Sequence, residues 1–301
     1  MKLHQFRNSL ILLLTATIWG TAFVAQSVAM DYIGPFTFNG IRFLIGGTVL
    51  LPFLFLMGKK KEELSETVGK QEKKTMWFGG IFCGIFLCIA SAFQQFGIKG
   101  TSVGKAGFIT ALYIILVPVF GIFLHKKAGM QLWLSVLIAI AGLYLLCMKK
   151  ETFALNHYDV ILLFSAATFA LHILCVDYFS PKMDSVKLSC IQFYVCAILS
   201  FIMMFITEHP DMSAIATAWK PILYAGVMSC GVAYTLQVVG QKDLNPVIAS
   251  LIMSLESVVS AIAGWLILGQ RLTKRETAGC VVMFVAIILA QLPSKRADGT
   301  Q

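Results

Sequence analysis

Charged residues are scarce in this chain: Asp, Glu, Lys and Arg make up 13% of its 301 residues, whereas hydrophobic residues make up 58%. A soluble domain of this size could not bury so much apolar surface. The ten-residue segments of alternating polarity that are typical of an outer-membrane β-barrel are also absent. These two features exclude a soluble globular protein and a barrel, and they leave a helical protein that crosses a membrane several times.

Signatures of catalysis and of cofactor binding are equally scarce. The chain has no Walker loop followed by Lys and Ser or Thr, and no His-Glu-x-x-His. Its eight cysteines all lie in apolar runs, and none forms a Cys-x-x-Cys pair. We interpret them as small hydrophobic residues rather than as disulfides or metal ligands. We therefore expect no enzyme, no metal and no cofactor, and ATP-driven transport would need a partner subunit.

Long apolar segments dominate what is present. There are ten of them, at about residues 9–29, 34–57, 76–97, 103–124, 129–148, 158–180, 187–207, 219–239, 246–268 and 276–292. About 20 helical residues cross a hydrocarbon core of about 30 Å. Lys and Arg are more frequent in the connections on the N-terminal side, which places both termini in the cytoplasm. We predict an all-α, multi-pass protein of the plasma or inner membrane with ten transmembrane helices.

The ten segments divide into five and five near residue 151, although the two halves share few identical residues. Because each half has an odd number of spans, the second half enters the membrane in the opposite orientation to the first. Inverted repeats of this kind place a binding site near the midplane, at the interface of the repeats. We predict two five-helix repeats, residues 1–150 and 151–301.

An acidic residue lies within one of the segments. Glu256 is ten residues into the segment that begins at Pro246, about 15 Å along a helix. A charge at that depth costs about 2.5–3.5 kcal/mol on insertion scales, so such residues face a bundle interior or a watery cavity. We predict that Glu256 borders a solute or proton site. The alternative is a neutral carboxylic acid that is hydrogen-bonded to a neighbouring helix.

Further polar and aromatic side chains deep in the segments complete the predicted substrate site, which consists of Trp19, Gln95, Tyr113, His172, Tyr234, Gln237 and Glu256. Gln94 and Gln95 point in different directions on a helix, so we expect at most one of them to face a cavity. For every residue of this set the alternative is packing or hydrogen bonding between helices.

Three other residues invite specific predictions. His172 titrates near neutral pH in water, at about 6.5, so together with Glu256 it is a candidate for proton coupling. Arg42 would either attract an anionic group of a solute or tie helices together, and we favour the structural role. Pro118 lies well inside the fourth segment, where we expect it to kink the helix.

Several motifs, in this order, resemble the EamA-type transporters of the drug/metabolite transporter superfamily. They are Trp19-Gly20, Arg42 in FNGIRFLIGG, Pro118 in LVPVF, the stretch SLESVVSAIAGWLILGQRLT and Gly279. The resemblance covers nearly the whole chain as two EamA-like halves. It implies exporters and permeases of amino acids, metabolites and drugs, with a central cavity lined mainly by spans 1, 3, 4, 6, 8 and 9.

The chain departs from the family pattern at two positions. Ser257 stands where the family often has Pro, so a proline kink in the ninth segment is left open. Gln270 stands where Glu is common.

We therefore predict a secondary transporter that exports small organic metabolites, such as amino acids or amphiphilic drugs, by alternating access, with its two halves rocking about the cavity. Its partners are then the solute, the lipid bilayer and, in the coupled case, a proton. The net charge of +9 is explained by cytoplasmic loops, so no nucleic acid is expected. Two alternatives are a membrane enzyme acting on lipid-linked substrates, and a membrane protein that binds a ligand without moving it.

Overall fold

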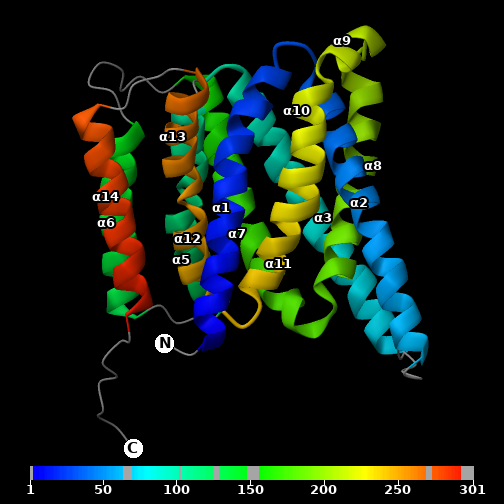
Figure 1. Ribbon diagram of the computed structural model, residues 1–301, viewed down its shortest axis with the longest axis horizontal. Helices are drawn as coiled ribbons and strands as arrows, with labels where there is room; N and C mark the ends of the chain where they lie inside the picture. The colour runs from blue at the N-terminus through cyan, green and yellow to red at the C-terminus, as the bar shows by residue number, and fades with distance from the viewer. Residues whose placement is uncertain are drawn as a thin grey trace, which may run out of the picture.

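A computed structural model of the chain describes residues 3–63, 70–101, 103–124, 129–147, 156–268 and 273–292, and these residues form helices and no strand (Figure 1). The first half contains α1 (Leu3–Ala29), α2 (Pro35–Glu63), α3 (Lys70–Lys99), α4 (Val103–Ala111), α5 (Tyr113–Phe123) and α6 (Met130–Cys147). Residues 269–272, which belong to the predicted family motif and include Gln270, lie outside the described ranges.

The second half contains α7 (His157–Phe179), a short 3-10 helix η1 (Ser180–Lys182), α8 (Ser185–Thr207), α9 (Met212–Thr217), α10 (Trp219–Tyr224), α11 (Thr235–Gln241), α12 (Pro246–Met253), α13 (Glu256–Leu268) and α14 (Lys274–Gln291). A π-helix, η2 (Ala225–Tyr234), joins α10 to α11 without a gap. π-Helical turns are rare, and they frequently lie at functional sites.

Length and composition identify the membrane-crossing helices. Within the described residues, eight helices are long and apolar enough to span a membrane, and two shorter apolar helices cover Met130–Leu145 and Thr277–Ala290. The predicted all-helical membrane protein is thereby confirmed. The count of ten spans and the inverted repeats remain predictions.

The helices stand side by side, with α1 in the middle of the bundle (Figure 1). Helix α1 contacts α10, η2 and α11 on one side and α4, α12 and α13 on the other. Helices α6 and α14 form a pair at one edge, whereas α2, α3 and α8 lie at the opposite edge. Helix α1 begins and α14 ends at the same end of the bundle. The central position of α1 brings its side chains between the two groups of helices.

A side chain from the second half holds the beginning of α2. The carboxylate of Glu208, directly after α8, accepts hydrogen bonds from the backbone N–H groups of Phe36 and Thr37, both at 2.8 Å, and from the Thr37 hydroxyl at 2.6 Å. The first N–H groups of a helix have no partner within the helix, and they favour a negative charge. Glu208 therefore joins the end of α8 to the start of α2.

Two of the spans are interrupted near their middle. The fourth predicted segment breaks at Leu112, between α4 and α5, and the ninth breaks at Ser254 and Leu255, between α12 and α13. At each break a backbone N–H bonds three residues back, from Leu112 to Ile109 and from Leu255 to Ile252. Pro118, where we expected the kink, lies inside α5, so the interruption falls earlier in the chain than predicted.

Candidate functional site

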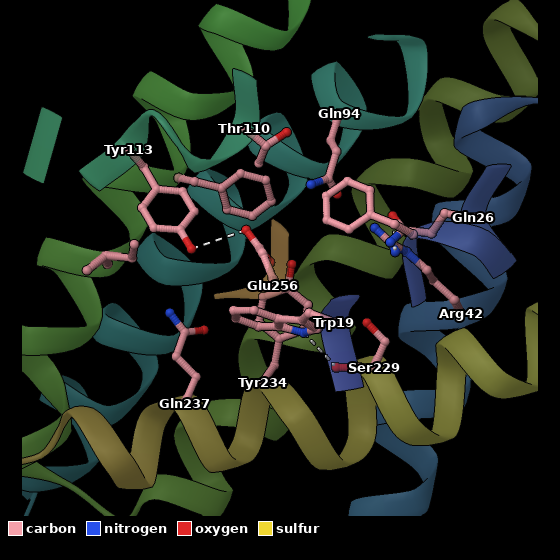
Figure 2. A pocket seen from close by; sticks show the side chains of 13 residues that line it. Trp19, Gln26, Arg42, Gln94, Thr110, Tyr113, Ser229, Tyr234, Gln237 and Glu256 are labelled. Atoms are coloured by element: carbon pink, nitrogen blue, oxygen red, sulfur yellow. Dashed lines mark hydrogen bonds between the residues drawn. The ribbon is translucent and has the colours of Figure 1, made fainter. Parts of the chain in front are cut away.

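A cavity lies where α1 meets the two interrupted spans. Its lining comes from both halves of the chain and consists of Trp19, Phe23, Gln26, Arg42, Gln94, Thr110, Tyr113, Phe169, Ile173, Ser229, Tyr234, Gln237 and Glu256 (Figure 2). The cavity volume is about 30 Å³. A water molecule needs roughly 10–15 Å³ of such volume, whereas sites for drug-sized ligands measure roughly 300–1,000 Å³. The cavity as it stands therefore has room for water-sized molecules, and an organic solute would need the helices to separate.

The two helix breaks meet at this cavity. Tyr113 is the first residue of α5 and Glu256 is the first residue of α13. The Tyr113 hydroxyl donates a hydrogen bond of 3.1 Å to Oε1 of Glu256, and both side chains are buried (Figure 2). A carboxylate accepts hydrogen bonds in its ionised form and can also donate one when protonated. Glu256 can therefore exchange a proton or a cationic partner while Tyr113 holds its orientation.

Serine side chains surround the break in the span that contains Glu256. The hydroxyls of Ser250, Ser254 and Ser260 each donate to the carbonyl three residues earlier, at 2.7–2.9 Å. Such hydroxyls compete with the backbone for helical carbonyls and bend helices. The Ser257 hydroxyl instead donates to the carbonyl of Gly107 on α4, at 3.1 Å. Ser250 and Ser254 thus satisfy their hydroxyls within the span, and Ser257 ties the start of α13 to α4.

Trp19 forms the floor of the cavity beside Glu256. Its indole Nε1–H donates to the backbone carbonyl of Ser229 in η2 at 3.3 Å, and its ring centroid lies 4.7 Å from that of Tyr234 (Figure 2). The adjacent Gly20 lets α1 approach α13 closely, because a Cβ there would lie 2.7 Å from the Glu256 carbonyl oxygen. An aromatic pair with an anchored polar edge suits the apolar part of an amphiphilic solute.

A cationic side chain lies away from the carboxylate, on α2. Arg42 is 1% exposed, and its Nη1 donates to Oε1 of Gln26 on α1 at 3.1 Å. Figure 2 shows this pair at the opposite side of the view from Tyr113. The cavity therefore carries one carboxylate and one guanidinium, together with aromatic rings and amides.

The structure places five of the seven predicted site residues in the lining, namely Trp19, Tyr113, Tyr234, Gln237 and Glu256. Gln95 and His172 are fully buried outside it. The lining contains Gln94 rather than its neighbour Gln95, in accord with the expectation that only one of them faces a cavity.

His172 belongs to a layer behind the cavity wall. Its Nε2 lies 3.0 Å from Oε1 of Gln192, and its ring packs edge-on against Tyr234 with centroids 6.3 Å apart. Because Tyr234 stands in front of it, His172 is placed to support the wall rather than to contact a solute.

Several lining residues were not in the predicted set. Gln26 shares a helical face with Trp19, and that spacing was the signal that could have found it. Arg42 was noted but assigned to structure. Thr110 shares a helical face with Tyr113, which was a signal of the same kind. Phe23, Phe169, Ile173 and Ser229 carry no signal in a single apolar sequence. Within the described residues, no group of three or more His, Cys, Asp or Glu side chains is arranged to hold a metal ion.

Comparison with known proteins identifies similar chains of nearly the same length. An "Uncharacterized transporter" of Archaeoglobus fulgidus is 28% identical over 283 residues, covering 93% of this chain and 84% of its own. "Uncharacterized transporter YwfM" of Bacillus subtilis is 24% identical, covering 96% and 95%. "Protein PagO" of Salmonella typhimurium is 22% identical, covering 93% and 91%.

Structural comparison gives the same fold. A protein of known crystal structure superposes with a TM-score of 0.77 at 17% identity, covering 97% of this chain and 99% of its own. The model of the EamA-like transporter family matches the sequence twice, over residues 7–148 and 157–292. These two stretches make up most of the sequence, and the chain therefore belongs to the EamA-like transporter family of membrane proteins.

Proposed function

We propose that this protein is a secondary carrier that exports small organic metabolites, such as amino acids or amphiphilic drugs, by alternating access coupled to protons. The proposed architecture has ten spans, in two inverted five-helix repeats at residues 1–150 and 151–301. Two observations support the repeats: the family model matches each half, and α1 and α7 run in opposite directions in Figure 1. Because α1 begins and α14 ends at one end of the bundle, and Lys and Arg are more frequent in the connections predicted on that side, we propose that both termini lie in the cytoplasm, with the protein in the plasma or inner membrane.

The observation that carries this proposal is the Tyr113–Glu256 hydrogen bond across the two helix breaks. A break gives each span a joint near its middle, and the bond ties the two joints at the wall of the cavity. Moving either half-span changes the surroundings of the carboxylate. Binding at Glu256 is therefore linked to opening of the cavity.

Proton coupling follows from the position of Glu256 in this arrangement. Among the described residues that line the cavity, Glu256 is the one with a carboxyl group, and this residue is 4% exposed. A buried carboxyl carries a proton or a cationic partner rather than standing as a bare anion. A proton entering from outside would displace a cationic group of the solute, such as an amine, from Glu256, and deprotonation inside would allow the next such group to bind. His172, behind Tyr234, takes no part in this cycle.

The test is transport by purified protein in proteoliposomes. A labelled candidate solute should accumulate against its gradient when a pH gradient is imposed, and should exchange with unlabelled solute in the absence of one. Glu256→Gln should abolish accumulation but retain exchange. Asp243→Asn is a matched carboxylate-to-amide control, because Asp243 is exposed outside the cavity and Asn tolerates its backbone φ of 62°.

Two results would count against the proposal. Accumulation that ignores the pH gradient, or that survives in Glu256→Gln, removes proton coupling. Ligand binding without any exchange across the vesicle membrane removes the carrier function and favours a ligand-binding membrane protein.

A further inference from the structure

The guanidinium of Arg42 is buried with most of its hydrogen-bonding capacity unused. An arginine carries five N–H donors. Its Nη1 donates to Gln26, whereas Nε and Nη2, which together carry three donors, have no hydrogen-bond partner among the described residues. The side chain is 1% exposed and lines the cavity. A buried polar group without a partner is costly, so the vacant donors require an explanation.

No carboxylate in the described part of the chain lies in direct contact with this cation, and the carboxyl of Glu256 in the same cavity is hydrogen-bonded to Tyr113 instead. The hydrogen bond with Gln26 involves a neutral amide. The guanidinium carbon lies 4.8 Å from the ring centroid of Phe43 and 5.1 Å from that of Phe38. Contacts with aromatic faces stabilise a cation by less than the cost of leaving a buried charge unpaired.

Resting on the proposed carrier function, we propose that Arg42 is an anion subsite that binds a carboxylate group of the transported solute. The planar guanidinium presents parallel N–H donors that match the two oxygens of a carboxylate. A single negative charge neutralises the single cation, whereas a doubly charged phosphate would leave an excess charge in the cavity. Phe38 and Phe43 pack beside the guanidinium, and Gln26 fixes one end of it.

This subsite narrows the class of solute. A ligand with a carboxylate and an apolar or aromatic body can place the carboxylate at Arg42 and the body against Trp19 and Tyr234. The corresponding amide has the same shape but cannot neutralise the guanidinium. The carrier should therefore prefer carboxylates over their amides, and purely cationic compounds should bind weakly because they meet Arg42 with a like charge.

The test uses purified full-length protein and two pairs of ligands that differ only at the carboxylate. The pairs are 3-phenylpropanoate with 3-phenylpropanamide, and L-phenylalanine with L-phenylalaninamide. Dissociation constants come from the rise of the thermal unfolding midpoint with ligand concentration. Arg42→Gln removes the charge and Arg42→Lys keeps it without the planar fork. Arg7→Gln, at an exposed position on α1 outside the cavity, is the matched control.

We expect the carboxylate of each pair to bind at least about tenfold more tightly than its amide in the unmodified protein and in Arg7→Gln, as for hydrogen bonds to a charged group. The preference should disappear in Arg42→Gln and persist in reduced form in Arg42→Lys. If Arg42→Gln does not fold, the ligand pairs with the unmodified protein and Arg42→Lys still decide the question.

Three binding results overturn the subsite. They are equal binding of carboxylate and amide by the unmodified protein, a preference that survives in Arg42→Gln, and displacement of 3-phenylpropanoate by chloride or inorganic phosphate at equal concentration, which would indicate a site for inorganic anions. Exchange of the amide as fast as the acid in proteoliposomes would leave the carrier function standing and remove the subsite. Tight carboxylate binding without exchange would leave the subsite standing and remove the carrier function.

Discussion

The break between α4 and α5 and the break between α12 and α13 use the same backbone turn but present different chemistry. Both turns hold a Leu whose N–H bonds three residues back, and neither contains Pro or Gly. The first residue after the turn is Tyr113 in one span and Glu256 in the other, and the two meet in a hydrogen bond. The backbone device is thus shared between the halves, whereas the ionisable group belongs to the second half alone.

The largest expected effect is on the free energy of unfolding, and it comes from proline substitutions at two positions in the span that contains Glu256. Ser257 lies in the first turn of α13, where proline is tolerated, whereas Ser260 lies one turn further along. Ser260→Pro should lower the free energy of unfolding by about 3 kcal/mol or more, and Ser257→Pro by only about 1 kcal/mol. Thermal unfolding in detergent measures both.

Equal losses for the two proline variants would show that the break does not isolate α13 from α12. The two interrupted spans would then differ from unbroken helices only in their side chains, and not in a backbone joint.

An intermediate effect on stability should distinguish Gly20 from Gly107, two glycines that face α13. A Cβ on Gly20 would lie 2.5 Å from Cβ of Val259 and 2.7 Å from the Glu256 carbonyl oxygen, whereas the nearest atom to a Cβ on Gly107 would be the Ser260 hydroxyl at 3.3 Å, a tight contact that a small shift of this side chain relieves. Gly20→Ala should therefore cost about 1–3 kcal/mol of stability, as for overpacked sites, and Gly107→Ala clearly less. The unfolding midpoints of the two variants provide the comparison.

If Gly20→Ala were as stable as Gly107→Ala, α1 would not be held closely against α13. The position of Glu256 would then have to be fixed from α4 and α5 instead.

The smallest expected effect comes from the phenol that joins the breaks. Tyr113→Phe removes one hydrogen bond to Glu256, worth about 1 kcal/mol, so solute exchange should change by roughly threefold to tenfold. Tyr194→Phe is the matched control, since the Tyr194 hydroxyl lies near Thr48, away from the cavity. Initial rates of exchange in proteoliposomes measure both variants.

Unchanged exchange in Tyr113→Phe would indicate that the Tyr113–Glu256 hydrogen bond does not affect the rate of solute exchange. An equal loss in Tyr194→Phe would indicate a general effect on folding rather than one on the link between the breaks.

The sequence predicted the apolar segments and the buried carboxylate well because both depend on local composition. It did not predict the breaks, since proline is the strongest local signal and Pro118 lies within an intact α5. The spacing of Ser250, Ser254 and Ser257 was a weaker sign of a bent helix.

Choices that depend on packing were harder still. Gln94 and Gln95 are chemically identical neighbours, so only the rotation of α3 decides which one reaches the cavity. The role of Arg42 likewise depends on which groups from other helices surround it, and a single sequence does not contain that information.

The hydrogen bonds from the start of α2 to Glu208 have a mechanical consequence. They fasten a helix of the first half to the end of a helix of the second half, and α2 packs along α8 while α3 packs along both α7 and α8. A rigid unit made of α2, α3, α7 and α8 is therefore expected to swing as one body. The line along which the molecule would open then cuts across the order of the chain, so that α1 and α2, and likewise α3 and α4, would lie on opposite sides of it although they are consecutive.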